Sequence, residues 1–172
     1  MSGLILSVIG SDRPGLTQAL AGAVLAAGGN WLESHLSRLG GKYVGSVLVE
    51  VPAGAEDRLR DAVAAIDPAG LSVSLVAAGE AAGTGAPLGL QLVGTDRPGI
   101  VREVSAALAA LGVNIEELDS DIENSAWSGA PLFRAKLGLA LPAGVTPADV
   151  QAALEGISGE IMVDLTLPVA RR

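Results

Sequence analysis

Residues 9–16 read IGSDRPGL and residues 93–100 read VGTDRPGI, so the chain contains one phrase twice. The aspartates of the two phrases are 84 residues apart, and Asn30 and Asn114 keep that separation. In both places an apolar run precedes the phrase and a helix-spaced apolar pattern follows it. A fixed internal period of this kind predicts a duplicated domain in which one strand–turn–helix unit is used twice.

Each copy continues with the pattern of two further strands, a second helix and a last strand. Apolar runs and turn residues predict strands at 4–9, 31–39, 43–51 and 71–76, and at 88–93, 115–122, 132–141 and 161–167. The helices are expected to begin near Pro14 and Pro98 and to run past Leu59 and Val150. The order βαββαβ predicts an α+β, ferredoxin-like fold, with two helices on one face of a four-stranded antiparallel sheet.

The domain limits follow from the glycine-rich stretch between the copies. It has no apolar periodicity, so we expect domains at 1–78 and 88–172 with a linker at 79–87. The sequence Pro-Ala-Gly at 52–54 recurs at 142–144, which is 90 residues later instead of 84. The hairpin of the second copy therefore carries six extra residues, around 123–131, where a functional difference between the copies is expected.

Composition excludes several classes of function. The net charge of −8 disfavours direct nucleic-acid binding and anionic membranes, because both need clustered basic residues. The chain has no cysteine and one histidine, His35, which argues against disulfides, zinc fingers and catalytic Cys–His pairs. No basic residue precedes the first apolar run, and glycines interrupt the apolar segment 14–32, so we expect a cytoplasmic protein without a membrane span.

The repeated Asp-Arg-Pro-Gly admits two interpretations. It can be a plain helix start, in which the aspartate caps and the proline occupies the first turn. Its recurrence amid changed neighbours favours a second role, in which the free N–H groups of the helix start receive a ligand carboxylate. A helix dipole supplies only about 0.3–1 kcal/mol, whereas millimolar binding needs about 4 kcal/mol.

The ligand therefore needs a second contact with the protein, besides the helix start. We expect Asn30 and Asn114, at the head of the next strand, to lie beside the helix starts and to bind the amine or carbonyl of a small amino acid. The predicted ligand-binding residues are Asp12, Arg13, Pro14, Gly15, Asn30, Asp96, Arg97, Pro98, Gly99 and Asn114.

The phrase, its apolar helix and the following Gly-x-Asn-Ile resemble the ACT domain, at 9–31 and again at 93–115. The first copy departs from the pattern with Trp31 in place of isoleucine. The resemblance implies a regulatory module that binds amino acids where its first helix meets a neighbour. Two copies with no attached enzyme, together with the stretch 128–133, resemble the glycine cleavage system transcriptional repressor family. That resemblance implies glycine as the signal and action on a transcriptional activator protein instead of DNA. The expected ligand is a small amino acid of the glycine or serine class, and exposed strand edges and sheet faces favour a homo-oligomer.

Two alternatives stay open: an interaction module that binds no ligand, and a detached regulatory subunit of an amino-acid or one-carbon enzyme. We expect no catalytic residues, no metal site and no cofactor. One acidic strip, Glu117, Asp119, Asp121 and Glu123, follows one face of a strand. It is expected to face solvent or a partner, with hard-cation binding as the alternative.

Overall fold

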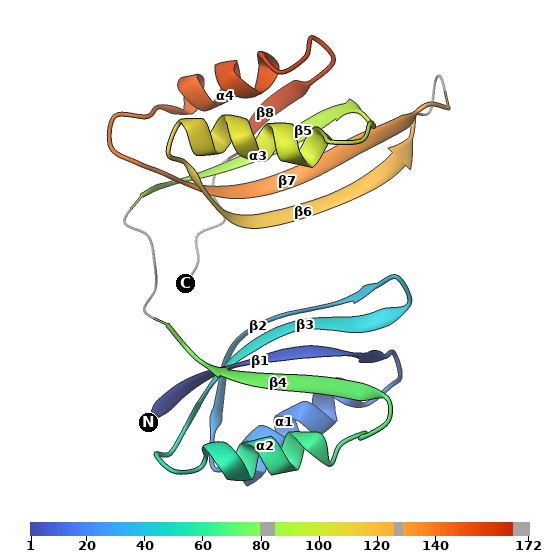
Figure 1. The fold of residues 1–172 in the computed structure, drawn as a ribbon, viewed down its shortest axis with the longest axis vertical. Coiled ribbons are helices and arrows are strands. Elements are labelled where there is room, and N and C mark those ends of the chain that lie inside the picture. Colours follow the sequence, from blue (N-terminus) through green and yellow to red (C-terminus); the bar gives the residue numbers. More distant parts are fainter. Residues whose placement is uncertain (80–84, 126–128, 167–172) are drawn as a thin grey trace. The chain divides into compact units, whose positions relative to one another are not determined.

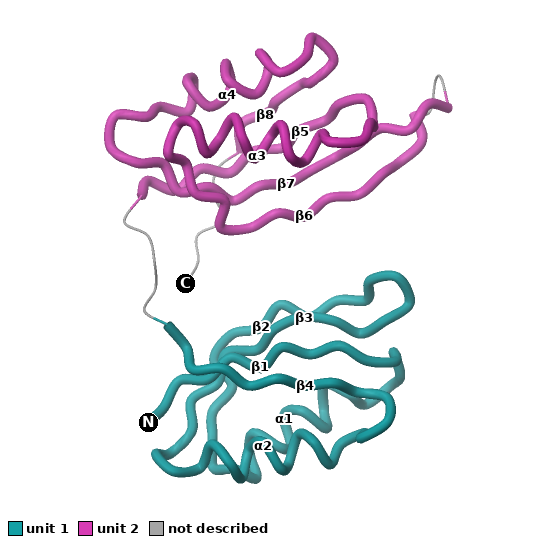
Figure 2. Tube along the Cα trace, in the orientation of Figure 1, with its two compact units in different colours: residues 1–81 teal, residues 82–172 magenta. Residues whose placement is uncertain are grey.

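The computed structural model describes residues 1–79, 85–125 and 129–166. The chain divides into two compact units, residues 1–81 and 82–172 (Figure 2). Each unit is described by itself. The predicted stretch 128–133 and the predicted last strand each extend partly outside the described residues, and the linker positions 80–84 and Trp127 lie wholly outside them.

The first unit is a four-stranded antiparallel sheet with the strand order β2-β3-β1-β4. Helices α1 and α2 both lie on one face of it (Figure 1). The elements in chain order are β1 (Ser2–Ser11), α1 (Leu16–Ala26), β2 (Asn30–Leu39), β3 (Lys42–Val51), α2 (Glu56–Ala64) and β4 (Leu71–Ala77).

The second unit repeats this arrangement, with the strand order β6-β7-β5-β8 and helices α3 and α4 on one face (Figure 1). Its elements are β5 (Ala86–Thr95), α3 (Ile100–Ala110), β6 (Asn114–Asn124), β7 (Pro131–Leu141), α4 (Pro147–Glu155) and β8 (Met162–Thr166). The predicted fold, two tandem ferredoxin-like βαββαβ units, is confirmed.

Alternating side chains of the central strands build both cores. Leu4, Leu6 and Val8 of β1 are buried, and the register places them opposite β3 positions that face the same helices. The second core is built in the same way from Leu88, Leu90 and Leu92. Because aromatic residues make up only 2% of the chain, these cores are almost entirely aliphatic, and each unit depends on close packing of Leu, Val, Ile and Ala.

Element ends differ from the prediction in a few places. Ala86 and Pro87, expected in the linker, belong to β5 and lie opposite Leu141 and Ala140. The second helices end before the isoleucines expected to mark them, although Ile66 and Ile157 still pack against the cores. The boundaries at 78 and 88 stay predictions.

The hairpin of the second unit has both longer strands and a longer connecting loop than the hairpin of the first unit. Strands β6 and β7 each have 11 residues, against 10 in β2 and β3. The remaining inserted residues lie between Asn124 and Pro131, where the first unit has only Gly40 and Gly41. This hairpin lies at the end of the sheet that carries the repeated loop, because Thr95 is opposite Leu132.

Candidate functional site

Both Asp-Arg-Pro-Gly loops join the first strand of a unit to its first helix, and in both the glycine is the N-cap residue. Gly15 has a φ of 90° and Gly99 a φ of 92°, a left-handed conformation that glycine adopts without a steric penalty. No side chain caps either helix. The expected aspartate cap is therefore wrong, and each proline precedes the helix instead of occupying its first turn. The glycine is needed for the turn itself.

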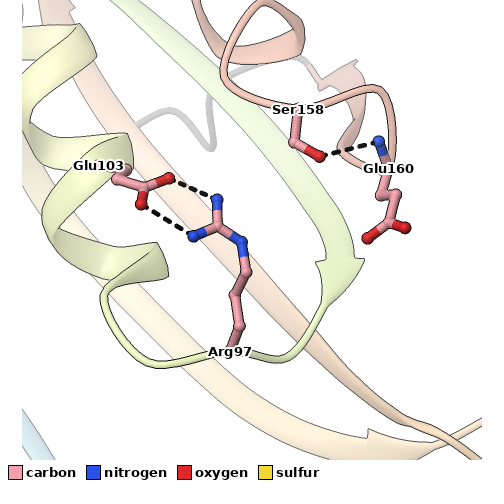
Figure 3. Close-up of polar contacts among 4 residues, drawn as sticks. All are labelled: Arg97, Glu103, Ser158 and Glu160. Carbon is pink, nitrogen blue, oxygen red and sulfur yellow. Dashed lines mark hydrogen bonds and ion pairs between the residues drawn. The ribbon is translucent and has the colours of Figure 1, made fainter.

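The two motif arginines use different partners. Arg13 forms an ion pair with Asp67, in the connection between α2 and β4, with Nη2 and Oδ2 3.3 Å apart. Arg97 instead forms a two-pronged pair with Glu103 on α3 (Figure 3), with one Nη1–Oε1 distance of 2.8 Å. At the 84-residue spacing Glu103 corresponds to Ala19, so the first unit lacks that carboxylate. Both arginines therefore form ion pairs within their own unit.

The Arg97–Glu103 pair predicts an acid-sensitive contact. Its hydrogen bonds lower the pKa of the Glu103 carboxyl below the ordinary value and raise the pKa of Arg97. Since the pKa of Glu103 is lower in the folded state, the pair stabilises the fold above the ordinary glutamate pKa of about 4.3 and loses that effect as pH falls through the folded pKa. We expect an NMR pH titration to show the depressed pKa, and Arg97→Ala to return it upward. An unchanged titration in Arg97→Ala would contradict the assignment.

The two asparagines do not lie beside the loops. Asn30 is opposite Glu50, which is opposite Gly3, near the start of β1. Asp12 follows the end of that strand, nine residues further along, or about 30 Å at strand spacing. Asn114 is likewise level with Pro87, at the end of its sheet remote from Asp96. The helix runs back along the strand, so the next strand begins at the opposite end. The structure therefore separates the predicted asparagine contact from the predicted loop.

A hollow of about 480 Å³ adjoins the second loop. The loop and the start of α3 form one wall, and the ends of β6 and β7 form the other. The hollow is lined by Asp96, Arg97, Gly99, Ile100, Val101, Ser120, Asp121, Ile122 and Phe133. Among the described residues no ion pair involves the Asp96 carboxylate.

In the first unit two side-chain bridges cross the equivalent place. Arg38 of β2 reaches Asp12, with Nε and Oδ2 3.3 Å apart. The hydroxyls of Thr17, on α1, and Tyr43, on β3, are 2.8 Å apart. Both bridges join the loop or the helix start to the sheet.

The second unit cannot form either bridge. At the repeat spacings Arg38 corresponds to Ile122, Thr17 to Val101 and Tyr43 to Phe133, so each bridging group is replaced by an apolar side chain. Only the aspartate is kept. Our sequence analysis missed these three positions, although alignment of the two copies at offsets of 84 and 90 would have identified them.

The other residues singled out in the sequence, the acidic strip and His35, lie on exposed strand surfaces beside polar neighbours. Register places Lys136 opposite Asp119 and Arg134 opposite Asp121, and Arg134 also forms an ion pair with Glu123. Within the described residues no three acidic or histidine side chains converge as metal ligands would. His35 lies 3.1 Å from Glu33 on the exposed strand β2. The acidic strip is accordingly part of a charge-paired strand surface.

Known proteins with similar sequences or structures share this architecture. Residues 2–75 match the family model of the ACT domain. A crystal structure of an unknown protein from Galdieria sulphuraria is 29% identical, with a TM-score of 0.81 over 95% of this chain and 96% of that one. A crystal structure of a candidate glycine cleavage system transcriptional repressor is 15% identical, with a TM-score of 0.69 over 96% of both chains. No curated protein matches the chain significantly.

Fold and site together define a duplicated βαββαβ protein, with one loop bridged by its own side chains and one beside an open hollow. The first unit matches the family model of the ACT domain, and the second unit repeats the same fold. In the part of the chain that the structure describes, no helix is both long and apolar enough to span a membrane.

Proposed function

We propose that the protein is a non-catalytic regulator that binds a free amino acid at the loop of its second unit and signals through protein contacts. The observation that carries the proposal is the asymmetry between the two loops. Asp12 is engaged by Arg38, whereas Asp96 borders a hollow of about 480 Å³. That volume lies within the range of small-molecule sites, about 300–1,000 Å³.

The chemistry of the hollow suits an amino acid. The Asp96 carboxylate borders it and favours a cationic amine, whereas Asp121 lies opposite Arg134 on the other face of the sheet. Gly99 and Val101, at the start of α3, line the same space, while the Ile100 N–H donates to the Arg97 carbonyl. The first N–H groups of a helix have no partner within the helix and favour a carboxylate. A ligand with an amine and a carboxylate a few ångströms apart can use both.

The regulatory part of the proposal comes from similarity in fold. The candidate glycine cleavage system transcriptional repressor shares the whole two-unit architecture. This supports glycine as one ligand to test, and a transcriptional activator protein as the kind of partner. The net charge of −8 favours control through protein contacts over DNA contacts. A cytoplasmic location and self-association complete the proposal.

The bridged first loop favours a second candidate role for the first unit alone. Because its own side chains span the site, this unit is suited to contacts with a partner instead of a ligand. In that arrangement the first unit contacts a protein partner without a ligand, and the second unit senses the amino acid. A detached regulatory subunit of an enzyme remains the alternative for the whole chain, and copurification of a catalytic subunit would favour it.

The test is calorimetric titration of the full chain with the twenty amino acids. We expect saturable binding that Asp96→Ala weakens at least tenfold, because a hydrogen-bonded charge contributes about 1.5–3 kcal/mol. The matched control is Asp12→Ala, which changes the same motif residue in the bridged loop and should leave affinity within twofold. Absence of heat with all twenty amino acids would overturn the sensor proposal, and equal losses in both variants would overturn the assignment to the second unit.

A further inference from the structure

We infer that the site of the second unit selects an amino acid with an aliphatic side chain over glycine. The inference rests on the proposed function, since it names the class of ligand for that same hollow. It is argued from the side chains that replace the bridges of the first unit.

Three apolar side chains face the space where the first unit has polar ones. Phe133 forms a buried floor, at 6% exposure, while Val101 and Ile122 are 41% and 59% exposed beside it. Ile122 is opposite Phe133 in the β6–β7 ladder, so the sheet side of the hollow presents two adjacent apolar groups. Exposed aliphatic side chains grouped around a concavity are typical of a surface that is covered in the functional state.

Glycine cannot cover these groups, because it has no side chain. Its amine and carboxylate would pair with the charged end of the hollow and leave Val101 and Ile122 in contact with water. An aliphatic side chain removes that surface from water, and full burial of each methylene contributes about fourfold in affinity. The hollow is open on one side, so burial is partial. An overall preference of at least tenfold for leucine over glycine is expected.

The residues that line the hollow also determine which class of ligand side chain fits it. A cationic side chain would leave its charge beside apolar groups, and an acidic one would lie near Asp96. Ser120 supplies one hydroxyl at the sheet side. Uncharged aliphatic side chains therefore fit the lining better than charged ones do.

The test compares L-leucine, L-valine and glycine by titration calorimetry on the full chain and on the variant Val101→Thr/Ile122→Ser. We expect leucine and valine to bind at least tenfold more tightly than glycine. The variant should weaken leucine binding at least fivefold and change glycine binding less than twofold. Met162→Ser is the matched control, because Met162 is an exposed side chain of the same unit outside the hollow, and leucine binding should be unchanged.

The outcomes separate this inference from the proposed function. Glycine binding as tightly as leucine, and weakened by Asp96→Ala, would overturn the aliphatic preference and leave the sensor intact. Leucine binding that the double variant does not alter would also overturn the inference, because the preference would arise elsewhere. Binding of none of the three, with no heat from any other amino acid, would overturn both.

Discussion

Gly45→Ala is expected to lower the stability of the first unit by about 3–5 kcal/mol, one of the largest effects of any single methyl group in this chain. Gly45 lies in β3 between Val8 of β1 and Leu36 of β2, with a φ of 150°. A Cβ at this position would lie 1.9 Å from the backbone oxygen of His35. The obstacle is backbone, so relief requires β2 to move away from β3.

Denaturant unfolding of the variant and hydrogen exchange of the β2 amides would measure this effect. Gly22→Ala is the control, because a Cβ at that position in α1 meets no atom within 4 Å. The same change there should stabilise the helix by about 0.5–1 kcal/mol. A Gly45→Ala protein within 1 kcal/mol of the parent would show that β2 and β3 tolerate a wider separation.

Leu59→Ala is expected to cost the first unit about 2–5 kcal/mol, because it opens a cavity under a short helix. Helix α2 has nine residues, and only Leu59 and Val63 of these are buried. Leu59 has no exposed surface and packs in the core of the first unit. A nine-residue helix is not stable by itself in water, so its attachment to the sheet depends on these two side chains.

Thermal unfolding and far-ultraviolet circular dichroism would detect the loss of stability and of helix content. Leu39→Ala provides the comparison, since Leu39 is 71% exposed at the end of β2 and should change stability by less than about 0.5 kcal/mol. Equal effects of the two substitutions would mean that α2 does not depend on Leu59 for its position.

The two loops of the duplicated fold differ in the side chains beside the turn. Both keep the aspartate, the arginine and the left-handed glycine, so the backbone turn is the same. They differ in what crosses the space beside the turn: a Tyr43–Thr17 hydrogen bond in one copy, and a hollow floored by Phe133 in the other. In the proposed function, loss of one hydroxyl from each partner is the small change in sequence that leaves the second loop open to a ligand.

The sequence alone determined the architecture. The repeated phrase established the duplication, and the order of apolar runs and turn residues established the βαββαβ pattern of each unit. Positive φ at Gly15 and Gly99 also belongs to this local level, since it explains why the phrase ends in glycine.

Only the tertiary structure decided the site. Strand register separated Asn30 and Asn114 from the loops, and it brought Arg38 to Asp12 and Ile122 to Phe133. These contacts join residues at least 11 positions apart in the chain, through pairing of strands whose register no local pattern specifies. Local chemistry therefore fixed each turn and helix start, while long-range pairing fixed which side chains share a cavity and which close it.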